Sequence, residues 1–206
     1  MNEAQKQTLA QLSAILVREP VRTARLLLRP FAEADLPDLF AYLSQPEQQR
    51  MSGNPKVETL RDAQDVLHFY TDPSHPPYSF ALELLAEKKV VGNVSIRIYP
   101  FLESDEQLGE PRGVSLSYVL NENYWRRGLM SEVLRELYAV LFEKGKLEYI
   151  NSGYFAFNTA SAALQQKLGM KPWMEHVVER DGQRIPTKEM LLWRADWEAG
   201  QQAAKR

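Results

Sequence analysis

Segment 114–145 constrains the fold most, because its hydrophobic spacing changes from that of a strand to that of a helix across one short turn. The run VSLSYVL at 114–120 has the β-branched and aromatic content of a strand. From Tyr124 to Gly145 the apolar residues recur every three or four positions, which predicts a long amphipathic helix closed by glycine. A strand that leads directly into a long helix is typical of α/β proteins, in which helices cover a sheet.

The same spacing rules predict the other elements. Strands are expected at 25–29, 78–85, 90–99 and 147–155, helices at 3–18, 34–43, 59–70 and 158–168, and a closing hairpin over 170–193 around Asp181-Gly182. Gly92 interrupts its strand and predicts a bulge or a close backbone approach. An antiparallel meander comes first and a strand-helix-strand-helix unit second, so the fold class is α/β (α+β) with a mixed, largely antiparallel central sheet and helices on both faces.

Chain length, hydrophobic content and net charge exclude some classes of protein. The chain has 206 residues, 44% of them hydrophobic, which suits one domain with a sizeable core. A formal net charge of -2 lacks the basic face that nucleic-acid backbones require. The polar N-terminal segment and the lack of long apolar runs favour a cytoplasmic protein that binds no membrane.

Several kinds of reactive site are absent from the sequence. Without cysteine there are no disulfides, thiolate nucleophiles or sulfur-ligated metals. His68, His75 and His176 lie far apart and show no metal-ligand spacing, so no metal is expected. No serine lies in a Gly-x-Ser-x-Gly turn, which removes the common hydrolase motif.

The turn from Tyr124 to Ser131 has the features of a phosphate-binding loop. It precedes the first turn of the long helix, where backbone N–H groups have no intrahelical partner and the helix dipole is positive. Gly128 allows a close approach to the backbone, and Arg126 and Arg127 bring positive charge. By spacing alone, a basic helix start on a solvated surface is an equally good interpretation.

The stretch YVLNENYWRRGLMSE at 118–132 resembles the acetyl-CoA-binding motif of the GCN5-related N-acetyltransferase (GNAT) family. More narrowly it is similar to the branch of the ribosomal-protein N-terminal acetyltransferases, here called RimJ/RimL-like. Three further segments resemble that branch in the same order: TARLLLRPFAEAD at 23–35, the segment from Phe157 to Met170, and DGQRIPTKEMLLWRADW at 181–197. The resemblance spans residues 23–197.

This resemblance implies the acyl-CoA N-acyltransferase fold and direct attack of a primary amine on acetyl-CoA, with no covalent enzyme intermediate. The strands at 114–120 and 147–155 should splay and leave a V-shaped opening for the pantetheine arm. The resemblance implies that backbone groups of Val119 and Leu120 hold the pantetheine and the thioester carbonyl. The residues it implies for the pyrophosphate are Trp125, Arg126, Arg127, Gly128, Leu129, Met130 and Ser131.

The resemblance also assigns the catalytic candidates. It implies that Asn158 contacts the cofactor arm and that Ser161 protonates the departing thiolate, with Tyr118 a further candidate. From the residues alone, Asn158 is an ordinary helix N-cap and Ser161 an unremarkable first-turn serine.

The general base is where the chain departs from the family. The branch often has Glu-Ile-Gly-Tyr where this chain has SLSY at 115–118, so the strand carboxylate is missing. Ser115 can at most order a water molecule that takes the proton. Carboxylates of the acidic loop at 100–113 are the other candidates, unless that loop is simply solvated: Glu103, Asp105, Glu106 and Glu110. A second departure is Arg126, where the branch usually has glycine.

These inferences give three segments: an N-terminal helical extension at 1–20, an N-acetyltransferase domain at 21–198 and a C-terminal tail at 199–206. The expected acceptor is an amine, either a peptide N-terminus or a small molecule, and family members often form homodimers. Two alternatives remain: a catalytically degenerate protein that binds coenzyme A as a sensor, and an assembly module built on residues 1–20.

Overall fold

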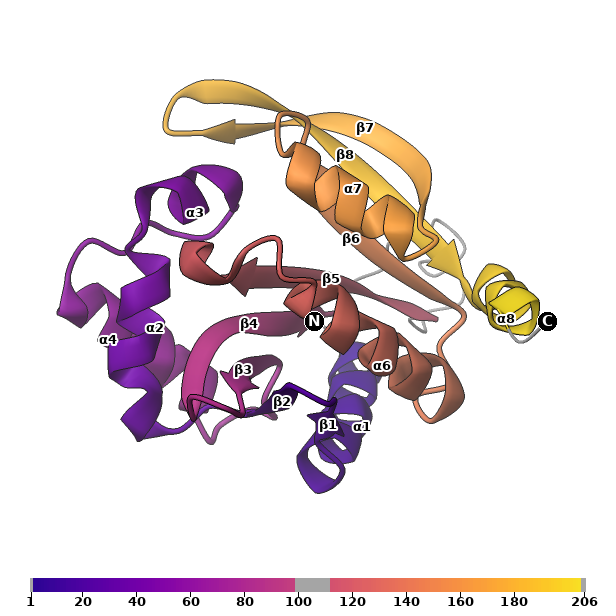
Figure 1. Ribbon diagram of the computed structural model, residues 1–206, viewed down its shortest axis with the longest axis horizontal. Coiled ribbons are helices and arrows are strands. Elements are labelled where there is room, and N and C mark those ends of the chain that lie inside the picture. The colour runs from indigo at the N-terminus through magenta and orange to yellow at the C-terminus, as the bar shows by residue number, and fades with distance from the viewer. Residues whose placement is uncertain (1, 99–111, 205–206) are drawn as a thin grey trace.

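The computed structural model describes residues 2–98 and 112–204 and contains one mixed sheet with helices on both faces (Figure 1). Its eight strands follow the order β1-β2-β3-β4-β5-β6-β8-β7, and of the recorded pairings only β5 with β6 is parallel. The predicted class, a largely antiparallel α/β sheet, is therefore confirmed. In chain order the strands are β1 Val21–Arg22, β2 Leu26–Pro30, β3 Ser79–Leu84, β4 Lys89–Arg97, β5 Gly113–Leu120, β6 Tyr149–Phe155, β7 Lys171–Arg180 and β8 Gln183–Trp193.

The helices agree with the predicted ones, with additions. They are α1 Glu3–Arg18, α2 Leu36–Leu43, α3 Pro46–Met51, α4 Leu60–Thr71, α6 Leu129–Glu143, α7 Thr159–Lys167 and α8 Arg194–Ala204, with 3-10 turns at Glu33–Asp35 and Glu122–Tyr124. The short polar helix α3 was not predicted, because PEQQRM has no apolar periodicity. Helix α8 runs through most of the segment expected to be a tail.

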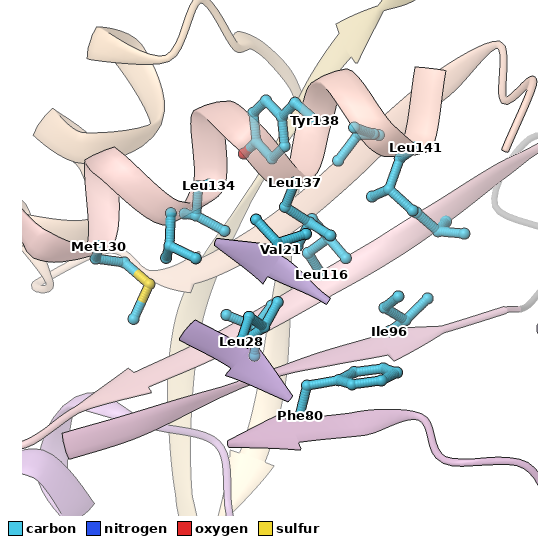
Figure 2. Close-up of a cluster of buried hydrophobic side chains, with 14 of the residues drawn as sticks. Val21, Leu28, Phe80, Ile96, Leu116, Met130, Leu134, Leu137, Tyr138 and Leu141 are labelled. Atoms are coloured by element: carbon cyan, nitrogen blue, oxygen red, sulfur yellow. The ribbon is translucent and has the colours of Figure 1, made fainter. Parts of the chain in front are cut away.

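The principal core lies between the sheet and helices α1 and α6. Figure 2 shows the side chains that α6 and the strands contribute to it. Leu134, Leu137 and Leu141 of α6 are completely buried against strand residues such as Leu28 and Leu116. Each such leucine stabilises the fold by roughly 1.5–3 kcal/mol relative to an exposed one.

Helix α1 belongs to this core. Its apolar side, formed by Leu9, Leu12 and Leu16, is buried in the same cluster. A Cβ added at Gly145, just beyond α6, would lie only 2.6 Å from Leu12 Cδ2, so the two helices meet closely there. The helical extension thus completes the fold, and its apolar side is not available to a partner.

The other face of the sheet is covered by α2 and α4. Leu39, Tyr42 and Leu67 from these helices form a second cluster with Ala81 and Val119 of the sheet. Thr59 caps α4 in a capping box with Asp62, which explains where that helix begins.

Strands β5 and β6 separate after a short parallel contact. They pair only from Gly113–Ser115 to Tyr149–Asn151, and beyond these residues Figure 1 shows them diverging. The predicted V-shaped opening therefore exists. Gly92 of β4 makes close contact with β5, since an added Cβ would lie 2.2 Å from the Val119 carbonyl oxygen.

The segment between Tyr99 and Leu129 carries two predictions, one for the start of the long helix and one for the acidic loop. The long helix begins at Leu129 and not at Tyr124, because Arg126 and Gly128 have positive φ angles, 62° and 76°, that an α-helix does not allow. The acidic loop with Glu103, Asp105, Glu106 and Glu110 lies almost entirely outside the described residues.

Candidate active site

A cavity of about 300 Å³ lies in the opening between β5 and β6. Side chains from both faces of the sheet reach it, because alternate residues of a strand point to opposite faces. Tyr118, Ser152 and Ser161 line it on the α7 side, whereas Ser115 and Glu189 line it on the other. A second cavity of about 420 Å³ adjoins it at Gly53, Asn54, Phe155 and Val178.

The Ser161 hydroxyl belongs to a network of polar side chains at the cavity. Its Oγ lies 2.8 Å from the Tyr118 hydroxyl and 3.1 Å from Gln165 Nε2, which is one helical turn further along α7. The same Gln165 nitrogen lies 3.1 Å from the Tyr118 hydroxyl and 3.2 Å from Ser152 Oγ. When Tyr118 donates to Ser161, the proton of Ser161 is free to point into the cavity.

Burial keeps Tyr118 protonated. Desolvation raises the pKa of the Tyr118 phenol above its ordinary value, although hydrogen bonds with Ser161 and Gln165 act in the opposite direction. Near neutral pH the phenol therefore keeps its proton and is able to donate it to the Ser161 hydroxyl.

Asn158 caps α7. Its Oδ1 accepts the Ser161 backbone N–H at 3.0 Å, and its Nδ2 donates to the Met51 carbonyl at the end of α3 at 3.2 Å. The N-cap interpretation of Asn158 is therefore correct. Asn158 also lines the cavity, and its contact with the cofactor arm stays a prediction.

The backbone N–H and C=O groups of Val119 do not point into the opening between β5 and β6. The Asn121 N–H donates to the Val91 carbonyl at 2.8 Å, so the alternation of the antiparallel ladder directs the backbone groups of Val119 toward β4. Those of Tyr118 and Leu120 point the other way, toward the opening. This differs from the expectation for Val119, whereas the role of the Leu120 N–H stays a prediction.

The start of α6 forms the candidate phosphate loop. Gly128 has a φ of 76°, and a Cβ added there would make ordinary contacts with Arg25 Nη2 at 3.8 Å and Ser131 Oγ at 3.9 Å, so the position has room but is not empty. Ser131 Oγ donates to the Gly128 carbonyl at 2.8 Å, which closes the first turn. Because the side chains of Leu129 and Met130 are buried in the core, only their backbone N–H groups can face a phosphate.

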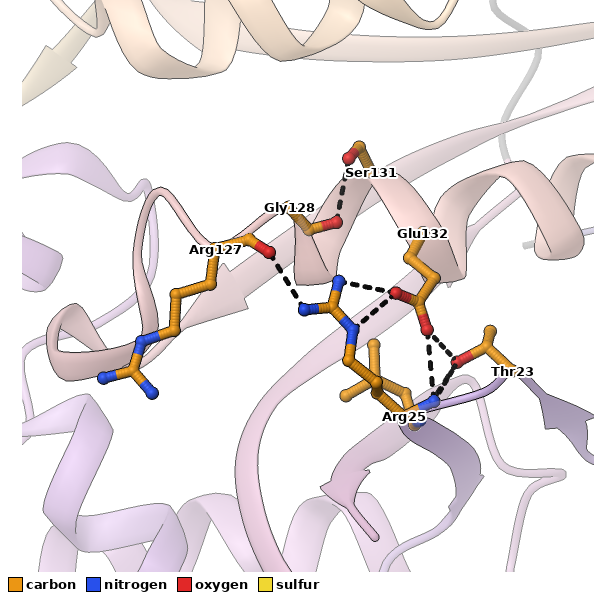
Figure 3. A network of polar contacts seen from close by, with 7 residues as sticks. Thr23, Arg25, Arg127, Gly128, Ser131 and Glu132 are labelled. Atoms are coloured by element: carbon orange, nitrogen blue, oxygen red, sulfur yellow. Dashed lines mark hydrogen bonds and ion pairs between the residues drawn. The ribbon is translucent and has the colours of Figure 1, made fainter. Parts of the chain in front are cut away.

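A polar cluster ties this loop to the entry of β2 (Figure 3). Arg25 pairs with Glu132 at 2.6 Å and donates to the Arg127 carbonyl at 3.1 Å, while Thr23 donates to the same carboxylate. Burial raises the pKa of Glu132, but the hydrogen bonds from Thr23 and Arg25 outweigh it and hold the pKa below its ordinary value. The first turn of α6 is thereby held in place from outside the helix.

Two side chains of this turn donate hydrogen bonds to nearby backbone carbonyls. The Trp125 indole N–H donates to the Leu120 carbonyl at 2.7 Å, and Arg127 Nη2 donates to the Asn123 carbonyl at 2.7 Å. Arg126 adopts the left-handed conformation that favours glycine, which is a physical reason for the glycine of the resembling branch. The contacts of these residues with a pyrophosphate stay predictions.

Among the site residues that sequence reasoning missed are Gln165, which contacts Ser161 and Tyr118, and Glu189, which lines the cavity. Gln165 lies four residues after Ser161, so helical spacing could have identified it. Glu189 of β8 reaches the cavity only through the pairing of β6 with β8, which no local pattern reveals.

Two absences concern only the residues that the structure describes. Within 2–98 and 112–204 no His, Asp and Glu side chains are grouped as a metal site requires. In the same ranges no helix is long and apolar enough to cross a membrane.

Comparisons with known proteins identify the family. A model of the acetyltransferase (GNAT) domain matches residues 25–171, most of the chain. The chain belongs to the GNAT acetyltransferase family. It is accordingly an acetyl-CoA-dependent N-acetyltransferase, and the N-terminal helix α1 lies outside the matched segment.

Solved structures of GNAT proteins share the fold at low sequence identity. A GNAT acetyltransferase from Bacillus anthracis has a TM-score of 0.73 at 18% identity, with 84% of this chain and 98% of that chain covered. One from Brucella melitensis has a TM-score of 0.75 at 17% identity, covering 91% and 84%. A RimL ribosomal L7/L12 alpha-N-protein acetyltransferase in complex with coenzyme A has a TM-score of 0.68 at 17% identity, covering 85% and 98%. The comparison with curated proteins found no match.

The cavity and loop fit the cosubstrate of this GNAT enzyme. An anionic pyrophosphate suits a helix start that has a glycine with positive φ and arginines nearby. A narrow thioester arm suits an opening between two strands that is lined by hydroxyl groups.

Proposed function

We propose that this GNAT enzyme acetylates a primary amine, either a protein N-terminal α-amine or a small amine, by direct attack on acetyl-CoA. The observation that carries the proposal is the Ser161 hydroxyl, placed in the opening by Tyr118 and Gln165. The acceptor assignment rests on the resemblance to the RimJ/RimL-like branch and on a cavity that continues past Phe155 toward β7.

Different groups of the protein bind the cosubstrate, polarise the thioester carbonyl and protonate the leaving sulfur. Bound acetyl-CoA supplies a thioester, whose carbonyl carbon the amine attacks. Backbone N–H groups at 128–131 hold the pyrophosphate, and the Leu120 N–H polarises the thioester carbonyl as its oxygen becomes negative. Ser161 gives its proton to the departing sulfur, and the hydrogen bond from Tyr118 stabilises the serine oxygen until a proton from water replaces the lost one.

The test measures binding and turnover on the same sample. Calorimetric titration with acetyl-CoA should show binding, and a free-thiol assay with peptides and small amines should show coenzyme A release that depends on the amine. Peptides that react better than polyamines would assign the α-amine acceptor. Failure to bind acetyl-CoA would contradict the proposal at its first step.

One observation favours a second candidate, a protein that binds coenzyme A without turnover. Position 115 carries serine, so β5 offers no carboxylate to accept the amine proton. Binding without thiol release from any amine would support that candidate and exclude the proposed reaction.

A further inference from the structure

The face of the sheet that carries Ser115 also carries a carboxylate from a distant strand. Ser115 of β5 is paired with Asn151 of β6, and Asn151 Nδ2 donates to Glu189 Oε2 at 2.9 Å. Ser115, Asn151 and Glu189 therefore lie side by side on three strands and on one face. This face is opposite to the one on which Ser161 and Tyr118 lie.

A glycine directs the Glu189 side chain into the cavity. Gly153 of β6 is paired with Glu189, and a Cβ added at Gly153 would lie 2.5 Å from Glu189 Oε1. The carboxylate therefore lies directly over the Gly153 backbone, where any larger residue would displace it. It is only 12% exposed, yet it lines the opening that holds Ser161.

Beside this carboxylate lies a histidine with access to solvent. His176 of β7 is paired with Thr187 and projects from the same face as Glu189. Its Nε2 lies 4.0 Å from Glu189 Oε1, and its side chain is 38% exposed. At 4.0 Å a proton passes between the two groups only through a bridging water molecule, and the exposed histidine can then release it to bulk water.

We propose that Glu189 accepts the amine proton in place of the carboxylate that β5 lacks, and that His176 passes this proton to solvent. The inference rests on the proposed acetylation of an amine. A charged ammonium entering from this face meets Glu189 before it reaches the thioester, and the carboxylate binds it by a charge-assisted hydrogen bond.

The proposed step balances. One ammonium proton moves to Glu189, leaving a neutral amine whose lone pair forms the new N–C bond. The C–S bond breaks, its electron pair stays on sulfur, and the sulfur takes a proton from Ser161. Of the two protons left on the nitrogen, one leaves through the same carboxylate and the other stays on the amide. Glu189 returns to its charged form as each proton passes through His176 to water. Ser161 regains its proton from water, so one proton is released per turnover.

The other ionisable groups around the cavity are few in the described part of the chain. Arg97 of β4 faces the cavity from beside Ser115, and Tyr118 of β5 faces it from the α7 side. Tyr154 of β6 also lines it. A pH profile of the reaction must therefore be compared between variants that keep all three.

The test compares Glu189→Gln with Glu175→Gln in the full-length protein. Glutamine at 189 keeps an acceptor for Asn151 but takes up no proton. Glu175 is paired with Lys188 and lies outside both cavities, so its variant carries the same chemical change elsewhere on the adjacent strand. Acetyl-CoA affinity, kcat/KM for the amine and its pH dependence are measured for both.

We expect Glu189→Gln to lower kcat/KM about 100-fold near pH 7, as loss of a general base does, with acetyl-CoA affinity unchanged. The loss should shrink as the pH approaches the pKa of the free amine, because the substrate then arrives unprotonated. Gly153→Ala should also lower kcat/KM by displacing the carboxylate, and this provides a second test if Glu189→Gln folds poorly.

The failures of the two proposals are distinguishable. An active wild type with Glu189→Gln and Gly153→Ala as fast as Glu175→Gln would overturn the role of Glu189 alone. A loss independent of pH would also overturn it, since that is the mark of a structural effect. A wild type that binds acetyl-CoA but releases no thiol with any amine would overturn the proposed function and this inference with it.

Discussion

At the scale of single residues, the proposed acid depends on its neighbours. A serine hydroxyl is a weak acid, and the Ser161 proton is directed only because Tyr118 and Gln165 occupy the other positions around its oxygen. Asn158 accepts a hydrogen bond from the Ser161 backbone N–H and so fixes the position from which the Ser161 side chain extends. The chemistry therefore depends on a network and not on one side chain.

Replacing Ser161 by alanine should slow the chemical step by roughly 10²-fold, the lower end of the range for lost acid-base assistance. Acetyl-CoA affinity should stay within a few-fold of wild type, because the phosphate loop is untouched. Single-turnover rates and calorimetric titration separate these effects. Thr159→Ala, an exposed change in the same helical turn, is the matched control, and a Ser161→Ala enzyme as fast as this control would remove the proposed acid.

At the scale of elements, the candidate phosphate loop depends on backbone angles that few residues adopt readily. Arg126 and Gly128 both have positive φ, and between them they turn the chain from the 3-10 turn into α6. The cluster of Thr23, Arg25 and Glu132 then fixes the first turn of the helix (Figure 3).

Gly128→Ala should lower the free energy of unfolding by roughly 1–2 kcal/mol, because a side chain disfavours the left-handed conformation. It should also weaken acetyl-CoA binding, since the loop can relax by moving its N–H groups. Gly182→Ala is the control: Gly182 has a φ of 73°, nothing within 4 Å of an added Cβ, and a position at the tip of the β7–β8 hairpin. Equal acetyl-CoA affinity in the two variants would contradict a phosphate-binding role for Gly128.

Helix α1 offers a second prediction at this scale. Leu12→Ala should destabilise the protein by about 2–5 kcal/mol, because it opens a cavity in the principal core. Val17→Ala, on the same helix at a side chain 46% exposed, should cost less than about 0.5 kcal/mol. Denaturant unfolding of both variants measures the difference. Similar stabilities for the two would restore the alternative that α1 serves an assembly and not the domain.

At the scale of the whole molecule, buried tyrosines set an alkaline limit to stability. Burial raises the pKa of Tyr42, Tyr118 and Tyr138 above the ordinary value of a phenol. The native state therefore disfavours their ionisation more than the unfolded chain does. Their contribution to stability is complete below the pKa of the unfolded residues and is lost as the pH rises through the folded values.

The free energy of unfolding should accordingly be constant up to about pH 9 and fall above about pH 10, the range in which unfolded tyrosine ionises. Denaturant titrations at several alkaline pH values would measure this slope. Tyr138→Phe should reduce the slope, since Tyr138 is buried and its hydroxyl donates only a weak hydrogen bond to the Met170 sulfur, at 3.5 Å. An unchanged slope would show that other groups control the alkaline transition.

The sequence by itself determined the elements whose signals are local. Apolar spacing predicted α6, α7 and most strands, and the run from Tyr118 to Glu132 resembles the acetyl-CoA-binding motif of the family that the domain match then showed. The helices and strands are readable because helix period, strand alternation and turn residues act over a few neighbours, whereas the donor-binding role of the run is what the resemblance implies. The start of α6 was placed too early, since a positive φ at an arginine has no clear sequence signal.

Only the tertiary structure decided which distant residues meet. The burial of α1 in the principal core, the direction of the Val119 backbone and the contact of Asn151 with Glu189 all depend on register and packing between segments far apart in the chain. Shifting a strand by one residue would turn Glu189 to the other face and leave the sequence pattern unchanged. The carboxylate absent from position 115 could therefore be found only where β6 and β8 place it.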